Sequence, residues 1–273
     1  MTSAAVFVTW GTVDVPNYTK YYINQLPGWF DEVYVVTNED RPVDVHWFKE
    51  RNIILKRYPN KSRDFEKHYY WMMEMGRHKV TSYSRLAMLN DCLVCYGPLD
   101  KLMNWTLTRH EDIVGINSSR FPTNHIQSYF LILRHSVLGK VWDHFDRTGV
   151  VTPLKEIDEY ELKLCKLAAT MMPMFPQGQR RGWDELFWLP FDEGIPLVKH
   201  QCIMPRKPVI LKSWQQRINR LAHPDTKAWQ YLPLLADKAY VHRSNTAGDA
   251  PHIVIRDDSR VVTVQQTHQE QRK

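Results

Sequence analysis

Two polar residues, Asn90 and Asp91, come directly after a short apolar run, Leu86 to Leu89, and shortly before a Gly-Pro turn. The apolar run predicts a buried strand that stops at the polar pair. In open α/β sheets, ligands bind outside the carboxyl ends of the strands, so Asp91 stands where such folds carry out their chemistry. Carboxylate and amide oxygens suit Mg²⁺ or Mn²⁺, which complete their coordination with water and substrate phosphates. The alternative is that the pair only starts a turn.

The composition describes a globular chain with a substantial core. It has 273 residues, of which 43% are hydrophobic and 24% charged, as expected for one domain with an elaboration or two small domains. No apolar run approaches the ~20 residues that cross a bilayer, and the first residues lack a signal-peptide pattern. Four cysteines make no disulfide framework, which fits a reducing compartment. We expect a cytoplasmic protein with at most peripheral membrane association.

The charge balance favours polyanionic partners. Lys and Arg number 36 and Asp and Glu 30, a net charge of +6, which suits nucleic acid, an anionic membrane face or the phosphates of a small ligand. There is no block of five or more Lys and Arg and no zinc-finger or RNA-recognition pattern, so we expect no nucleic-acid partner. Cys92 and Cys95 form C-x-x-C without a second Cys/His pair, so no zinc or redox site is expected.

The first elements predict a strand, a helix and a second strand. The β-rich run Ala4 to Thr9 ends at Trp10-Gly11. After it, the segment Asn17 to Leu26 carries aromatic residues at helical spacing, which predicts a helix. A second strand, Glu32 to Thr37, stops at Asn38. A right-handed crossover between parallel strands places Thr9 and Asn38 at the same sheet edge.

Repeated β and α elements continue from there and predict an α/β fold. Glu156 to Ala169 is expected as one helix with acidic residues near its start, and the chain after Pro173 as loop-rich. The recognisable domain is expected over residues 1–212. Residues 213–273 are expected as an extension with an amphipathic helix, Ser213 to Ala222, and a terminal hairpin of 253–255 with 261–264. The other expected elements are strands Asn52 to Arg57, Asp112 to Ile116 and His125 to Leu133, and helices Glu66 to Gly76, Leu99 to Arg109 and Val137 to Phe145.

Several ordered segments resemble one family. They are Trp10 to Val13 with Tyr21, Phe30 to Asn38, Arg57 to Phe65, Leu89 to Asp91 with Tyr96 to Leu99, Asp112 to Gly115, His125 to Phe130, and Tyr160-Glu161. On these segments, over roughly residues 5–210, the chain resembles the rhamnan synthesis protein F family of glycosyltransferases. The resemblance implies a GT-A-like single domain with a mostly parallel central sheet flanked by helices, followed by a C-terminal extension.

The resemblance also implies a reaction. Such enzymes transfer a sugar, typically L-rhamnose, from a nucleotide-diphosphate donor (UDP- or dTDP-sugar) to a glycan acceptor. A metal or cationic side chains must stabilise the leaving diphosphate. Asp91, with Asn90 or through water, is the candidate metal ligand, and His200 is a candidate late ligand whose alternative is a surface histidine. The sequence lacks the Asp-x-Asp of many GT-A enzymes, so Mn²⁺ or Mg²⁺ dependence is an open expectation.

A carboxylate must accept the acceptor's proton in an inverting transfer. Glu161 matches the family's acidic position and is our first choice, with Glu159 second. Sugar hydroxyls are expected to contact His125, Gln127 and Ser128, and Trp105, Trp183 and Trp188 are candidates to stack on sugars or to fill the core. The donor is expected to contact Thr9, Trp10, Gly11, Asn38, Arg57, Arg63, Asp64 and Asn90.

Two other classes remain open. A non-catalytic glycan-binding domain of the same fold would explain the missing Asp-x-Asp, and a basic nucleic-acid module is motivated by charge alone. The donor sugar, acceptor, linkage and anomeric outcome depend on pocket shape and are not fixed by the sequence.

Overall fold

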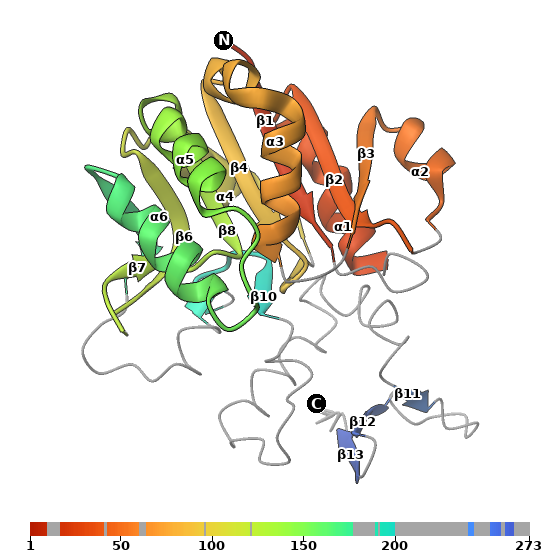
Figure 1. Ribbon diagram of the computed structural model, residues 1–273. Helices are drawn as coiled ribbons and strands as arrows, with labels where there is room; N and C mark the ends of the chain where they lie inside the picture. The colour runs from red at the N-terminus through yellow and green to blue at the C-terminus, as the bar shows by residue number, and fades with distance from the viewer. Residues whose placement is uncertain are drawn as a thin grey trace.

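The computed structural model describes residues 1–9, 17–40, 43–59, 64–95, 97–120, 122–176, 189–190 and 192–199, and the backbone of 240–242, 252–257 and 260–264 (Figure 1). Eight strands of the described chain form one sheet, with the order β3-β2-β1-β4-β8-β6-β7 and β9 paired to β6. Helices cover both faces of this sheet. The predicted α/β class with a mostly parallel central sheet flanked by helices is confirmed.

The first half of the sheet is parallel. β1 (Ser3–Val8) pairs with β2 (Glu32–Asn38) and β4 (Arg85–Asn90), and β2 pairs with β3 (Ile53–Tyr58). In this register Val8 lies opposite both Val36 and Asn90. The three strands β1, β2 and β4 therefore end together at one edge.

The second half of the sheet contains a reversed strand. β8 (Phe130–Arg134) runs antiparallel to both of its neighbours, β4 and β6 (Ile113–Ser119). The short strand β7 (His125–Ile126) pairs antiparallel with β6, and β9 (Met171–Phe175) pairs in parallel with β6. The segment before β8 consequently reaches the edge at which β4 ends.

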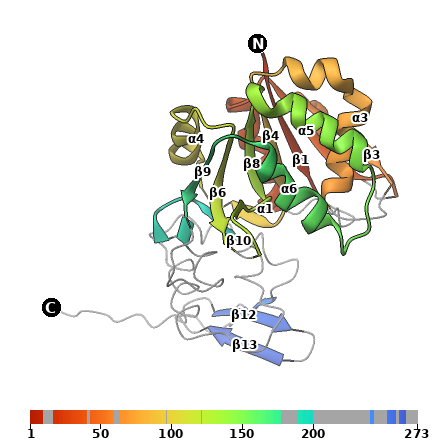
Figure 2. The same ribbon diagram turned by 60° about the vertical axis from the view of Figure 1, so that its left-hand side comes forward.

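The sheet separates two hydrophobic cores, because successive side chains of a strand point to opposite faces. Ala5 and Phe7 of β1 pack with α1 (Asn17–Gln25), the short helix η1 (Leu26–Gly28) and α4 (Asp100–Leu107). Val6 and Val8 pack on the other face with α3 (Asp64–Ser82), α5 (His135–Thr148) and α6 (Leu162–Leu167). Figure 2 shows α4 and α3 on opposite sides of the sheet. Each fully buried aliphatic or aromatic side chain stabilises the fold by roughly 1.5–3 kcal/mol.

Several elements differ from the sequence expectation. β9 lies where a loop was expected, with Pro173 in the strand. A separate two-stranded sheet joins β5 (Leu93–Cys95) to β10 (Leu197–Lys199), and α2 (Val45–Lys49) precedes β3. α3 continues beyond Gly76 to Ser82, with a kink at that glycine, whose φ is 73°. The expected helix Glu156 to Ala169 is a π-helical turn, η2 (Ile157–Glu161), followed by the shorter α6.

The C-terminal residues form a small sheet of their own. β12 (His252–Asp257) pairs antiparallel with β11 (Tyr240–His242) and β13 (Arg260–Val264). The boundary at residue 212 and the helix expected from 213 to 222 lie outside the described residues, so the division of the chain into a domain and an extension stays a prediction.

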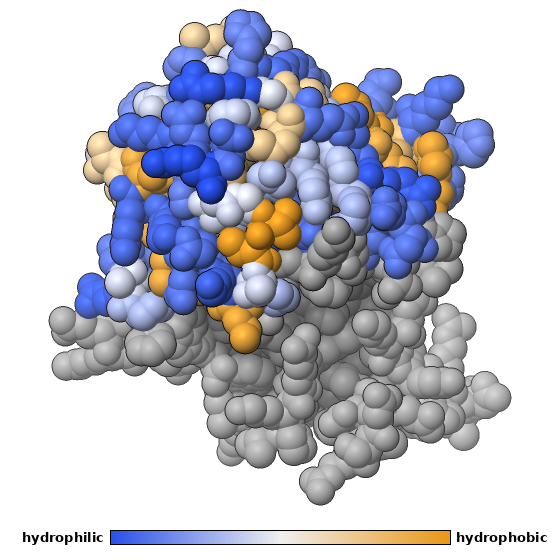
Figure 3. Space-filling view, in the orientation of Figure 1, coloured by the Kyte–Doolittle hydropathy of each residue, from blue (hydrophilic) through white to orange (hydrophobic). Residues whose placement is uncertain are grey.

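The described surface is mainly polar on the face that Figure 3 shows, where apolar side chains form small separate groups. Within the described part of the chain, every helix is too short or too polar to cross a bilayer. The cytoplasmic location stays a prediction.

Candidate functional site

Polar residues collect where β1, β2 and β4 end. Thr9 follows β1, Asn38 ends β2, and Asn90 and Asp91 come at the end of β4. This is the lower edge of the sheet in Figure 1, where β10 also lies. The arrangement matches the expectation that Thr9 and Asn38 share an edge with Asp91.

Asp91 is fixed from two sides. Its carboxylate Oδ2 accepts a 2.9 Å hydrogen bond from Thr9 Oγ1, and its backbone N–H donates to the carbonyl of Val8 at 3.2 Å. Thr9 is fully buried. This contact fixes the orientation of the Asp91 carboxylate at the end of β4.

Asn90 makes two side-chain hydrogen bonds, one of which is the turn contact that was set out as the alternative to a ligand site. Its side-chain oxygen accepts a 3.1 Å hydrogen bond from the N–H of Cys92, which is the turn geometry of an Asx residue. Its Nδ2 donates to Asp64 Oδ2 at 2.6 Å. Asp64 begins α3, so the turn brings a second carboxylate to the end of β4.

A buried lysine lies among the acidic residues. Lys67 is 0% exposed and sits on α3, three residues after Asp64. Burial lowers the pKa of Lys67, and the carboxylates of Asp64, Asp91, Glu66 and Glu156 act in the opposite direction. A cationic Lys67 would offset part of their charge. Sequence reasoning missed it, because a lysine on an amphipathic helix is normally solvated.

Glu156 provides a further link between distant segments. Its Oε1 accepts a 2.7 Å hydrogen bond from the backbone N–H of Phe65, 91 positions earlier, and its side chain is buried. The start of α3 is thereby tied to the segment that leads into the π-helical turn η2.

The surroundings of Cys92 show which charged groups share this site. Burial is the largest cause that raises the pKa of the Cys92 thiol, and the carboxylates of Asp64 and Asp91 raise it further. Glu161 also raises this pKa, whereas Lys199 lowers it. Glu161 and Lys199 therefore lie within electrostatic reach of the strand end that carries Asp91. Lys199, at the end of β10, also lies 5.0 Å from the ring of Tyr129. In the sequence, Lys199 could have been noticed only as a cation at the end of a short apolar run.

Glu161 contacts the predicted acceptor segment. Its Oε1 accepts a 3.0 Å hydrogen bond from the N–H of Ser128 and lies 3.8 Å from His125 Nε2. His125 Nδ1 lies 2.8 Å from the carbonyl of Thr123, a contact that requires the proton on Nδ1 because a carbonyl only accepts. Gln127 is buried, and its N–H donates to the carbonyl of Asn117 at 2.9 Å.

Glu159 faces elsewhere, although it is only two positions away. It pairs with Lys163 on the same helical surface, and this hydrogen bond holds the pKa of the Glu159 carboxyl below its usual range. A π-helical turn, a feature common at functional sites, gives the two glutamates these different neighbours.

Other predicted residues lie at the margins or outside the described residues. Arg57 is exposed at β3 and donates to the carbonyl of Glu39 at 2.8 Å, while Asn38 is buried at the end of β2. Trp105 packs against the α1/α4 core, with Arg109 over its ring at 5.6 Å, which is a structural role. The remaining predictions, outside the described residues, are Trp10, Gly11, Arg63, Trp183, Trp188 and His200.

The described residues fit a divalent cation only in part. Within them, no group of three or more His, Cys, Asp and Glu could hold a metal. Asp91 and Asp64 nonetheless supply two carboxylates at one strand end, and Mg²⁺ is commonly held by one or two carboxylates together with substrate phosphates. The donor chemistry thus suits a cation that arrives with a diphosphate, and metal dependence stays a prediction.

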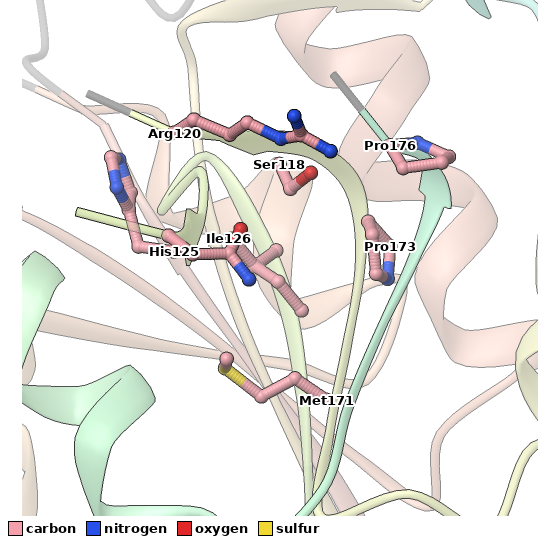
Figure 4. A pocket seen from close by; sticks show the side chains of 8 residues that line it. Ser118, Arg120, His125, Ile126, Met171, Pro173 and Pro176 are labelled. Carbon is pink, nitrogen blue, oxygen red and sulfur yellow. The ribbon is translucent and has the colours of Figure 1, made fainter. Parts of the chain in front are cut away.

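A pocket of about 230 Å³ lies beside the acceptor segment (Figure 4). Ile126, which lines the pocket, packs directly against Gly115. A Cβ at position 115 would lie 2.2 Å from Ile126 Cγ2 and 2.8 Å from the carbonyl oxygen of Phe130. His125 lines the pocket and also faces Glu161, so the pocket adjoins the predicted base. The lining residues are Ser118, Arg120, Asn124, His125, Ile126, Met171, Pro173 and Pro176.

Comparison with known proteins gives weak similarities to transferases. No family model matches the chain, and no curated protein matches it. A solved structure described as a nucleotide-diphospho-sugar transferase of Desulfovibrio desulfuricans is 13% identical with a TM-score of 0.37, covering 85% of this chain and 99% of that one.

Two further solved structures are similar at the same level. The glycosyltransferase GlyE of Streptococcus pneumoniae is 12% identical (TM-score 0.38; 84% of this chain, 63% of that one). A glycosyltransferase involved in glycosylation of the major capsid of PBCV-1 is 9% identical (TM-score 0.36; 72% and 94%). A function for this chain therefore has to be argued from its own side chains.

Proposed function

We propose that the chain is a glycosyltransferase that moves a sugar from a nucleotide-diphosphate donor to a glycan acceptor. The observation that carries the proposal is that two differently bonded carboxylates, those of Asp91 and Glu161, both raise the pKa of the Cys92 thiol just after the end of β4. The Asp91 carboxylate is oriented by the hydroxyl of Thr9, and Glu161 faces Ser128 and His125. The two groups supply what the reaction needs, a leaving-group site and a base.

The donor half of the proposed site lies at the ends of β1, β2 and β4. Thr9, Asn38, Asn90 and Asp64 surround the nucleotide and its phosphates, with Arg57 at the margin. Asp91 would hold Mn²⁺ or Mg²⁺, and the cation would supply positive charge that offsets the charge on the leaving diphosphate. Lys199 adds a fixed positive charge near the same strand end, and cations placed where charge develops stabilise a transition state.

The acceptor half supplies the base. The acceptor hydroxyl oxygen forms a bond to the anomeric carbon while the bond from that carbon to the diphosphate oxygen breaks, and the hydroxyl proton passes to Glu161. The diphosphate leaves with the bonding electrons. Glu161 is preferred over Glu159 because Glu159 pairs with Lys163. The acceptor's other hydroxyls bind to the 125–128 segment. L-rhamnose is the proposed sugar, as for the rhamnan synthesis protein F family.

Calorimetric titration with UDP and dTDP tests this proposal. We expect binding that strengthens with Mn²⁺ or Mg²⁺, weakens with a chelator, and is lost in Asp91→Asn. Asp146→Asn is the control, since Asp146 is exposed on α5. Binding unchanged in Asp91→Asn would remove Asp91 from the donor site, and absence of nucleotide binding under all conditions would overturn the transferase proposal.

One observation favours a second candidate, a glycan-binding domain without turnover. The buried ammonium of Lys67 lies among the carboxylates that a metal would otherwise neutralise. An oligosaccharide that binds while neither UDP nor dTDP does would support this reading.

A further inference from the structure

The two carboxylate oxygens of Glu161 have different surroundings. Oε1 accepts a 3.0 Å hydrogen bond from the N–H of Ser128 and lies 3.8 Å from Nε2 of His125. Among the described residues, no side chain or backbone group donates to Oε2. Because an ionised carboxylate is acceptor-only, the oxygen without a donor keeps its lone pairs for an incoming proton.

The ring of His125 is held by its other nitrogen. Nδ1 lies 2.8 Å from the carbonyl oxygen of Thr123, and because a carbonyl only accepts, Nδ1 is the donor of this bond. Nε2 is the ring nitrogen that faces Glu161, and a proton on Nε2 makes its contact with Oε1 attractive. Contacts between catalytic groups are often this long before substrate binds and tighten in the reacting complex. The imidazole thus connects a backbone carbonyl to one oxygen of the proposed base.

Two hydrogen bonds fix the segment that begins at His125 against the helical residues that carry Glu161. The N–H of Ser128 bonds to Glu161, the last residue of the π-helical turn η2. The N–H of Ile126 donates to Sγ of Cys165 at 3.3 Å, and Cys165 lies on α6, four positions after Glu161. Residues four apart lie on the same side of a helix. The distance between His125 and Glu161 is therefore set by the fold from both sides.

Burial separates the roles of the two side chains. The side chain of His125 is 4% exposed and that of Glu161 is 16% exposed. An acceptor hydroxyl can approach the open edge of Glu161, whereas His125 is more deeply buried. Both ring nitrogens of His125 are directed at protein atoms, so neither is left for a sugar hydroxyl.

We propose that His125 is a positioning residue for the base. Together with the N–H of Ser128 it holds Oε1 of Glu161, so that Oε2 receives the acceptor proton: the O–H bond of the acceptor breaks and a bond from Oε2 to that proton forms. This role replaces the expectation that His125 contacts a sugar hydroxyl and leaves the other residues of the 125–128 segment to the acceptor. The proton transfer rests on the proposed transferase function, but the contact between His125 and Glu161 can be measured without turnover.

Two substitutions separate the two ring nitrogens. The amide of asparagine lies near the position of Nδ1 and that of glutamine near the position of Nε2. His125→Asn should therefore keep a polar group toward Thr123 and lose the contact with Glu161, whereas His125→Gln should keep a donor toward Glu161. Because a misplaced catalytic group costs up to ~100-fold in rate, we expect kcat to fall about 10–100-fold in His125→Asn, and most of it to be recovered in His125→Gln.

The measurement is kcat and the acceptor KM, with dTDP-L-rhamnose and UDP-L-rhamnose as donors and octyl glycosides as acceptors. The acceptor KM should stay unchanged, because only the placement of the base is altered. His135→Gln is the matched control: its Nδ1 also lies against a backbone carbonyl, that of Tyr83 at 3.1 Å, but His135 follows the opposite end of β8. A raised acceptor KM with unchanged kcat in His125→Asn, or equal defects in His125→Asn and His125→Gln, would overturn the proposal.

A double-mutant cycle tests the contact without turnover. Urea denaturation is compared for the unaltered protein, His125→Asn, Glu161→Ala and the double variant. The loss of stability in the double variant should be smaller than the sum of the two single losses, because each single change already removes the shared contact. Additive losses would overturn the proposal, since the two side chains would then not interact in the folded protein.

A UDP titration of the same variants separates this inference from the proposed function. His125→Asn should bind UDP as the unaltered protein does, because His125 lies on the acceptor side. A protein in which positions 125 and 161 are coupled but which turns over no nucleotide sugar would keep the contact and remove the transferase.

Discussion

The Nδ2 atom of Asn90 lies 2.6 Å from Oδ2 of Asp64, and this hydrogen bond joins the end of β4 to the first residue of α3. An amide can donate to a carboxylate, whereas a carboxylate in the same place would repel it. Asn90 also occupies the position directly before Asp91, in a chain that lacks the Asp-x-Asp of many GT-A enzymes. The contact gives a structural reason for an amide at that position.

The first prediction concerns this pair. Asn90→Asp places two carboxyl groups at hydrogen-bond distance, so one of them must hold a proton and its pKa in the folded state rises. The folded protein then binds more protons than the unfolded chain, and the free energy of unfolding falls as the pH rises. We expect a loss of about 1–3 kcal/mol at pH 8 and a smaller loss at pH 5, measured by urea denaturation.

Asn90→Ala is the control for this change. It removes the same hydrogen bond without adding a charge, so its cost should be nearly independent of pH. If Asn90→Asp behaved identically to Asn90→Ala across this range, Asp64 would not be facing position 90 as described.

The second prediction separates the two glutamates of the π-helical turn. Glu161→Gln should lower kcat by about 10²–10⁴, because the amide can still accept from Ser128 but cannot take a proton. UDP affinity should stay unchanged. Glu159→Gln should keep near-normal activity, since Glu159 bonds to Lys163 whereas Glu161 bonds to Ser128. The measurement is kcat of both variants with the nucleotide-sugar donor. A larger loss of kcat in Glu159→Gln than in Glu161→Gln would reverse our assignment of the base.

The third prediction concerns glycines in two environments. Gly115→Ala drives a methyl group into Ile126 and the backbone of Phe130 and should cost about 1–3 kcal/mol. Gly139→Ala is its counterpart: the nearest heavy atom to the new Cβ is Arg77 Nη2 at 3.5 Å, and alanine in a helix interior is worth about 0.5–1 kcal/mol over glycine. Urea midpoints should therefore move in opposite directions, and a tolerated Gly115→Ala would contradict the packing of β7 on β6.

The fourth prediction is a pH dependence. Asp112 accepts hydrogen bonds from Ser136 and from the N–H groups of Ala169 (2.7 Å) and Thr170 (3.3 Å). The bond from Ser136 is the largest cause that holds the pKa of the Asp112 carboxyl below its usual range. A depressed pKa stabilises the fold above the unfolded value, ~3.9, and this contribution disappears as the pH falls through the folded value.

Asp112→Asn should accordingly be less stable than the unaltered protein at pH 6–7, and the difference should shrink below about pH 4. Thermal unfolding across this range measures it, with Asp146→Asn as an exposed control. A difference that stays constant down to acid pH would mean that the Asp112 charge contributes nothing.

The sheet was predictable because its strands are buried on both faces. β1, β2 and β4 carry continuous apolar residues that stop at polar ones, and such runs mark parallel strands covered by helices. β9 was missed because Pro173 argues against a strand. Within the described part of the chain β9 pairs only with β6, and a strand at the edge of a sheet tolerates proline. β5 was missed because its three residues are too few to show the alternation of apolar and polar residues that marks a strand.

The site was predictable only where a polar residue follows a strong strand. Asp91 and Thr9 meet that condition, and Glu161 was found through the family resemblance. Lys67 and Glu156 could not be found, because a buried charge looks like a solvated one until the packing around it is known. The pocket beside β7 was equally hidden, since β6, β7 and β9 bring together residues more than fifty positions apart.

The reversed direction of β8 has a consequence for how such a chain can diversify. β1, β2 and β4 reach the site with their final residues, whereas β8 reaches it with its first, so the 125–128 segment arrives from the opposite side. Changes in the length of the 120–124 loop would reshape the acceptor side and leave the pairing of β1 with β2 and β4 untouched. Under the proposed function, this arrangement would let the acceptor vary while the donor side stays the same.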